Sequence, residues 1–155
     1  MSIMRKMSFA ILASLLIAGI GCAQEKKIKR SDLPPAVEKA VAEVSKSATI
    51  KGFNEEKEGG KTSYEVAMVV NGHTKEVQID PSGTVTEVEE EVALDSLPAE
   101  VKAGLAVKAG RGKIVKVESL TKKGMLVAYE AKVETAGKKS EIQVGPDGKP
   151  LNHAE

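Results

Sequence analysis

The stretch YEVAMVVNGHTKEVQIDPSGTV, residues 64–85, decides the fold. Apolar side chains recur at every second position on both sides of its centre, which is the period of a β-strand with one buried face. Asn71 and Gly72 form the pair that two-residue hairpins favour, because both positions require a positive φ. Pro81 and Gly83 suit the second and fourth positions of a type I turn. The stretch therefore predicts a hairpin that leads through a second turn into another strand.

A looser copy of this stretch follows 65 residues later, with Tyr129-Glu130, Ile142-Gln143-Val144 and Gly145-Pro146-Asp147-Gly148 in the matching places. Duplication at a fixed spacing is typical of an architecture built from repeated units. We expect an α+β fold of two tandem repeats, residues 31–94 and 95–155, with the last strand of the second truncated. Each repeat is expected to pack one helix on an antiparallel meander of three to four strands, because a meander alone leaves one apolar face open.

Two segments with helical spacing precede the meanders. The first opens at Ser31-Asp32-Leu33-Pro34-Pro35, where Ser or Asp can cap the free amides and proline is tolerated in the first turn. The second opens at Asp95-Ser96-Leu97-Pro98 and is expected to end at Gly110 and Gly112. The apolar faces of the two helices are Leu33, Val37, Ala40, Val41 and Val44, and Leu97, Val101, Gly104 and Leu105.

The remaining segments complete the predicted meanders. Residues 86–92 are ambiguous, since Val85, Val88 and Val92 have helical spacing and the glutamates favour a helix, but the preceding turn favours a strand, which we predict. Residues 54–61 are expected to form a polar loop. Further strands are expected at residues 48–53, 113–120, 125–135 and 138–144.

The N-terminus has the pattern of an export signal. Two basic residues precede an uncharged apolar run, Met7 to Ile20, whose 14 residues suit a signal peptide and are too few to span a membrane. Two cleavage patterns stay open within residues 1–23. Either the mature chain begins at Gln24 and is periplasmic or secreted, or Cys22 carries a lipid and anchors the protein to a membrane. Residues 24–30 are then expected to be a basic linker.

The charge is nearly balanced overall, with a formal net charge of +1, which argues against a nucleic-acid-binding surface. It is unevenly distributed. Residues 31–94 hold 13 acids against 6 bases, whereas residues 95–155 hold 8 acids against 11 bases. The default interpretation is a solvated surface, and the alternative is that the two halves dock onto each other.

The chemical inventory indicates neither catalysis nor a cofactor. After Ala23 there is no cysteine, and the histidines are His73 and His153, so a zinc site lacks ligands. A Ser-His-Asp group would need one of these histidines to be oriented and partly buried, and His73 on a loop and His153 at a terminus are poor candidates. The acidic run at Glu87 and Glu89–Glu91 could suggest calcium, but adjacent residues on a strand point to opposite faces. We expect no metal, no cofactor and no enzymatic activity.

The motifs of both copies resemble the PepSY-like family, which is related to the repeated fold of the β-lactamase inhibitor proteins. The resemblance implies an exported, non-catalytic module that inhibits peptidases or binds proteins in the bacterial envelope, and it assigns no binding residue. Gly145 departs from the pattern, because the first copy has Asp80 there. The matching residues are Leu33-Pro34, Val37, Tyr64-Glu65-Val66 and 77–85, and then Leu97-Pro98, Val101, Tyr129-Glu130, Ile142, Val144 and Gly148.

Two functional hypotheses follow. The first is a protein-binding module, inhibitor-like, that engages an unknown envelope protein through a sheet face and the loops at 54–61 and 121–124. The second is a structural or self-associating envelope protein that uses its acidic and basic halves. The candidate partner-binding residues of the first hypothesis are Asn54, Glu55, Glu56, Lys57, Glu58, His73, Lys122 and Lys123.

Overall fold

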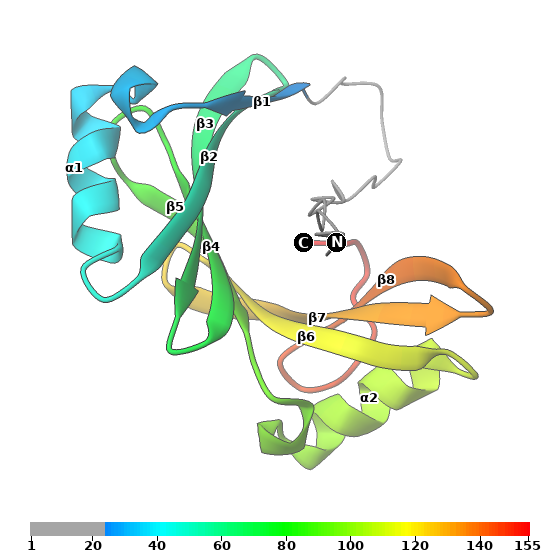
Figure 1. The fold of residues 1–155 in the computed structure, drawn as a ribbon. Coiled ribbons are helices and arrows are strands. Elements are labelled where there is room, and N and C mark those ends of the chain that lie inside the picture. Colours follow the sequence, from blue (N-terminus) through cyan, green and yellow to red (C-terminus); the bar gives the residue numbers. More distant parts are fainter. Residues whose placement is uncertain (1–23) are drawn as a thin grey trace, which may run out of the picture.

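Eight strands, each paired with its neighbours in the chain, form one antiparallel sheet in the computed structural model, which describes residues 24–155 (Figure 1). The predicted signal peptide, residues 1–23, and the lipidation of Cys22 lie outside the described residues. The strands are β1 (Gln24–Ile28), β2 (Thr49–Glu58), β3 (Lys61–Val70), β4 (His73–Ile79), β5 (Val85–Glu91), β6 (Lys113–Lys122), β7 (Met125–Thr135) and β8 (Lys138–Val144). The helices are α1 (Pro35–Val44) and α2 (Ala99–Ala109), preceded by the 3-10 turns η1 (Arg30–Asp32) and η2 (Leu94–Ser96).

The prediction of two repeats, each a helix on its own meander, is wrong. The two halves share a single sheet, because β5 pairs with β6 from Glu87 opposite Lys122 to Glu91 opposite Glu118. Two separate meanders would each leave two edges with unpaired backbone groups. Pairing β5 with β6 removes one edge from each half, and leaves β1 and β8 as the edges of the whole sheet.

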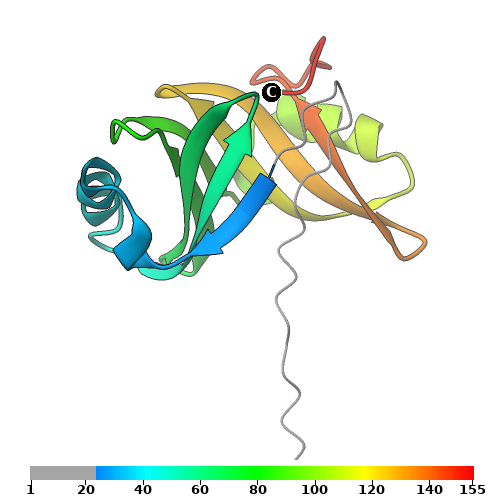
Figure 2. The same cartoon turned by 90° about the horizontal axis from the view of Figure 1, so that it is seen from above.

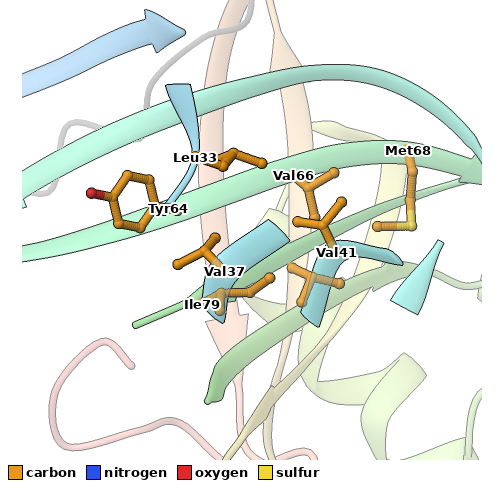
Figure 3. Packing of buried hydrophobic residues seen from close by; sticks show 8 residues of the cluster. Leu33, Val37, Val41, Tyr64, Val66, Met68 and Ile79 are labelled. Carbon is orange, nitrogen blue, oxygen red and sulfur yellow. The ribbon is translucent and has the colours of Figure 1, made fainter. Parts of the chain in front are cut away.

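Helix α1 covers the first half of the sheet. Val37 and Val41 are fully buried on its inner face and pack against Val66, Met68 and Ile79 (Figure 3). This is the apolar face that the sequence predicted, so the helix forms at the residues whose apolar spacing indicated it. The predicted cap is wrong, because the N-cap position is Pro34 and no side chain caps the helix.

Helix α2 covers the second half. Val101 and Leu105 are fully buried there, as expected, against Val117, Ala131 and Val144. The helix ends at Gly110 with φ +56°, which confirms the predicted glycine stop.

The turn after β8 lies directly against α2. A Cβ atom on Gly104 would lie 2.0 Å from the carbonyl oxygen of Gly148, and a Cβ on Gly148 would lie 2.1 Å from the carbonyl oxygen of Glu100. Glycine is therefore required at both positions for the turn to pack on the helix.

The hairpin that decides the fold is confirmed. Strands β3 and β4 pair from Tyr64 opposite Ile79 to Val70 opposite His73, and Asn71 at their turn has φ +51°. The ambiguous segment is a strand, β5, as predicted.

Two other segments differ from expectation. Residues 54–58, expected in a loop, continue β2, because their backbones pair with β3 down to Glu58 opposite Lys61. Residues 24–28, expected in a linker, form β1 at the edge of the sheet, opposite residues 53–57. Both segments carry mostly polar side chains, because only one side of the sheet is covered by a helix. The sequence pattern therefore did not predict them as strands.

The sheet curves, and both helices lie on its convex side (Figures 1 and 2). The strand pairing shifts register at four places, such as between Gln78 and Ile79 in β4 and between Leu120 and Thr121 in β6. Bulges of this kind bend a strand and increase its twist. The opposite face of the sheet is therefore concave, and neither helix covers it.

Candidate protein-binding face

The concave face carries the side chains that alternate with those of the two apolar clusters. Residues directly opposite each other on neighbouring strands share a face, so the register identifies the set. It is mostly polar and rich in carboxylates. Its members include Glu25 and Lys27 (β1), Asn54 and Glu56 (β2), Glu65 and Ala67 (β3), Glu76 and Gln78 (β4), Glu87, Glu89 and Glu91 (β5), Lys116, Glu118, Leu120 and Lys122 (β6), Ala128, Glu130 and Lys132 (β7), and Glu141 and Gln143 (β8).

Five glutamates form what we call the acidic strip, which crosses β2 to β5: Glu56, Glu65, Glu76, Glu87 and Glu89. Amide side chains hold two of them in place. The Nδ2 of Asn54 donates to the Oε1 of Glu65 at 3.0 Å, and the Nε2 of Gln78 donates to the Oε2 of Glu56 at 2.8 Å. Asn54 is only 3% exposed, so its bond to Glu65 is a fixed part of the face.

The carboxyl groups of the strip resist ionisation. The pKa of Glu89 is raised to about 8, mainly by burial and also by the neighbouring carboxylates of Glu130 and Glu76. Burial likewise raises the pKa of Glu65 to about 7, with Glu76 and Glu56 adding to the effect. Burial also raises the pKa values of the other three strip carboxyls. The strip is thus a set of crowded, half-buried acids.

The part of the face on β6 to β8 balances its charges. Glu118 is 3% exposed, and its two carboxylate oxygens pair with the Nζ of Lys116 and, at 3.5 Å, with the Nζ of Lys132. The Nε2 of Gln143 donates to the Oε2 of Glu130 at 2.9 Å. Buried acids are satisfied here by cations and amides from the protein itself.

Three carboxylates converge where the two parts of the face meet. Ligand oxygens of Glu89, Glu118 and Glu130 lie within 4.8 Å of one another, a set that could hold an oxygen-preferring cation. The sequence missed this group because Glu118 and Glu130 come from strands far along the chain. Lysines occupy both oxygens of Glu118 and Gln143 binds Glu130, so protein groups already use these oxygens.

The C-terminal residue lies on the same face. The backbone amide of Glu155 donates to the Oε1 of Gln143 at 2.9 Å. Its side-chain carboxylate lies 3.6 Å from the Nζ of Lys122, which also lies 3.8 Å from the carboxylate of Glu87. Glu155 thus contacts side chains of β6 and β8 on this face.

The predicted partner-binding residues are dispersed. The concave face includes Asn54, Glu56 and Lys122, whereas Glu55 lies opposite the buried Tyr64 and so points to the other side. Lys57 pairs with Glu55 at 3.1 Å. At the ends of hairpins, exposed to solvent, are Glu58, His73 and Lys123.

The principal acids of the face, Glu65, Glu76, Glu118 and Glu130, were not among the predicted site residues. The alternation of polar and apolar residues in each strand made their outward direction visible in the sequence. The order of the strands was not, and only that order gathers them on one surface.

Two hollows lie along the described residues. One, of about 150 Å³, is lined by Val92, Leu94, Ile114 and neighbouring residues, and the other, of about 20 Å³, lies among the glutamates of the strip. Pockets for small molecules are typically about 300–1,000 Å³. Neither hollow has the size of such a pocket.

No family model matches the chain, and no curated protein matches it. Solved structures do match. A BLIP-like protein from Bacteroides fragilis is 22% identical, with 77% of this chain and 84% of that chain covered and a TM-score of 0.58. The fold is BLIP-like.

Two further structures share the BLIP-like fold. A DUF2874 family protein from Bacteroides ovatus is 18% identical, with 77% and 85% of the two chains covered and a TM-score of 0.61. A candidate periplasmic protein from Bacteroides eggerthii is 20% identical, with 77% and 86% covered and a TM-score of 0.64. These structures support the BLIP-like fold in the resemblance drawn from the sequence, and they do not test its PepSY-like part. Within residues 24–155, no helix is long and apolar enough to cross a membrane.

Proposed function

We propose that the chain is an exported, non-catalytic protein-binding module that engages its partner with the concave face of the sheet. One observation carries this proposal: an eight-stranded sheet has one face covered by helices and the other left open, with half-buried polar side chains across it. A wide, ordered and uncovered surface suits the interface of about 800 Å² per partner that stable complexes use.

The other classes of ligand fit the face less well. Neither of the two hollows described above has the volume of a small-molecule pocket. The acidic strip repels the phosphates of nucleic acids, which bind basic surfaces. A protein surface is the ligand whose size and shape match a broad concave sheet.

The BLIP-like fold supports an inhibitor-like role in the envelope. BLIP denotes a β-lactamase inhibitor protein, and a neighbour of this fold is a candidate periplasmic protein. Together with the signal-like N-terminus, this supports a partner that is an exported enzyme, such as a peptidase, in the periplasm or outside the cell. If Cys22 is lipidated, the module acts from a membrane anchor, and mass spectrometry of the mature N-terminus distinguishes that chain from one beginning at Gln24.

Site-specific photo-crosslinking tests the proposal. A benzoylphenylalanine at Ala67, on the concave face, should crosslink one discrete partner in cells, and the same group at Val107, 81% exposed on α2, should not. The partner is then identified by mass spectrometry, purified and titrated against the module. The concave face is refuted as the docking surface if no purified candidate partner binds the module, or if both positions crosslink equally.

Self-association through the acidic and basic halves stays a prediction. Light scattering at low and high salt checks it, because oligomers held by opposite charges dissociate as salt screens them.

A further inference from the structure

Three carboxylates of the acidic strip, those of Glu65, Glu76 and Glu89, have no ion-pair partner among the described residues, whereas Glu87 lies 3.8 Å from the Nζ of Lys122. No lysine, arginine or histidine nitrogen of residues 24–155 lies within 4.0 Å of the carboxylates of Glu65, Glu76 or Glu89. Burying a carboxylate without a cation disfavours its charged form, which is the reason for the raised pKa values of Glu65 and Glu89. Within residues 24–155 these three carboxyls therefore have no paired cation, although Lys132 and Lys116, from a greater distance, partly offset the rise that burial causes in the pKa of Glu76.

The rest of the same face shows how it matches charge. Lys116 and Lys132 flank the buried carboxylate of Glu118, and Lys122 lies between the carboxylates of Glu87 and Glu155. Lysine side chains from β6 and β7 thus supply cations to the half of the face near them. The strands that carry the strip supply none to Glu65, Glu76 and Glu89.

Glu155 lies at the other end of the same face. It contacts the face with a backbone amide, which donates to Gln143, and with a carboxylate, which pairs with Lys122. This end of the face therefore contacts one residue through an amide side chain and an opposite charge. The contacting charge is negative there because it pairs with Lys122, which also lies near Glu87.

We propose that the acidic strip binds a lysine- or arginine-rich extended segment of the partner protein. This inference rests on the proposed function, since it names the chemistry of the partner that docks on the concave face. The strip crosses four strands, β2 to β5, spaced about 4.8 Å apart, so it spans about 14 Å. An extended segment of about five residues covers that distance at about 3.3 Å per residue and points alternate side chains at the sheet.

A cation placed among these acids favours their ionised forms, because an opposite charge within about 4–6 Å lowers a carboxyl pKa. Binding therefore releases protons from Glu65 and Glu89 when it occurs near neutral pH. The affinity for a cationic segment should accordingly rise as the pH increases from 6 to 8, and fall with added salt.

A charge-matched pair of variants tests the inference. The probe is a fluorescein-labelled octalysine peptide, followed by anisotropy at pH 7.5 and about 150 mM salt, where weak non-specific attraction is screened. The face variant is Glu76→Gln/Glu89→Gln, and the control is Glu43→Gln/Glu100→Gln, which removes the same charge from exposed helix positions. The face variant should bind at least about tenfold more weakly than wild type, and the control less than about twofold more weakly. Circular dichroism confirms that both variants fold.

The inference is overturned if the two variants bind octalysine equally, or if an uncharged glycine–serine octamer binds wild type as well as octalysine does. Its failure is distinguishable from failure of the proposed function. If a purified partner crosslinks at residue 67 but binds the face variant and wild type equally, the concave face is still the docking surface. The proposal of a cationic segment is then refuted. Absence of any partner at residue 67 would remove the docking face itself.

Discussion

Glu89→Gln should make the protein more stable at neutral pH. Glu89 is half-buried on β5 and faces Glu118 and Glu130 across the sheet, and burial raises its pKa to about 8. Glutamine has nearly the same shape and cannot ionise, so the substitution removes the cost of protonating this carboxyl on folding and leaves the packing.

The sign of the pH effect follows from proton binding. In the unfolded chain the group has its ordinary pKa of 4.5, and in the folded protein its pKa is about 8. Between these values the folded state binds more protons than the unfolded state, so the free energy of unfolding falls as the pH rises. Each pKa unit corresponds to about 1.4 kcal/mol, so Glu89 alone should lower the unfolding free energy by about 2 kcal/mol between pH 5 and pH 7.

Urea unfolding followed by circular dichroism at pH 5, 6, 7 and 8 measures this effect. The Glu89→Gln variant should be more stable than wild type by about 2 kcal/mol at pH 7, by less at pH 5, and should lose less stability as the pH rises. Glu100→Gln, at an exposed position on α2, is the control and should leave the pH dependence of wild type unchanged. A wild-type stability that is constant or rises from pH 5 to pH 8, or a Glu89→Gln variant less stable than wild type at pH 7, would refute the reasoning.

Three further predictions concern packing and are checked by urea or thermal unfolding. Gly104→Ala should destabilise the protein by about 1–2 kcal/mol, because its Cβ would lie 2.0 Å from the Gly148 oxygen and overpacking outweighs the gain in helix propensity of about 1 kcal/mol. Gly52→Ala, with no atom within 4 Å of the new Cβ, should change stability by less than about 0.5 kcal/mol. Equal losses of stability in Gly52→Ala and Gly104→Ala would contradict the close contact between Gly104 and Gly148. Val37→Ala, at a fully buried position, should cost about 2 kcal/mol, whereas Val107→Ala, 81% exposed, should be nearly neutral; similar losses would mean that α1 does not pack as described.

The sequence predicts local structure well and the joining of the halves poorly. The Asn71-Gly72 hairpin, the apolar faces of both helices and the glycine stop of α2 all form as expected, because each depends on neighbouring residues. The pairing of β5 with β6 depends instead on two strands separated by α2, and no local pattern in either strand indicates it. The two-repeat prediction failed at this point.

The same limit explains the site. The alternating pattern of the strands predicted that the glutamates of the site point away from the helices. Such an acid is ordinarily exposed to solvent, so the pattern did not predict that it is half-buried. Glu118 shows the difference, since it is 3% exposed although it follows the core residue Val117 and so points away from the helix-covered side. The pairing of β5 with β6 and of β6 with β7 brings Glu89 beside Glu118 and Glu130, and no local pattern in the sequence indicated that strand order.

Stability and binding should respond in opposite directions to the same change. A carboxylate buried without a cation lowers the stability of the free protein, and a docked lysine or arginine segment would offset that cost. Replacing Glu76 and Glu89 by glutamine should therefore raise the free energy of unfolding and weaken octalysine binding together. A purely structural role for these acids predicts a different result, in which the double variant loses stability and any change in binding follows from partial unfolding. Measuring both quantities on one preparation separates the two explanations, and it does so before the natural partner is known.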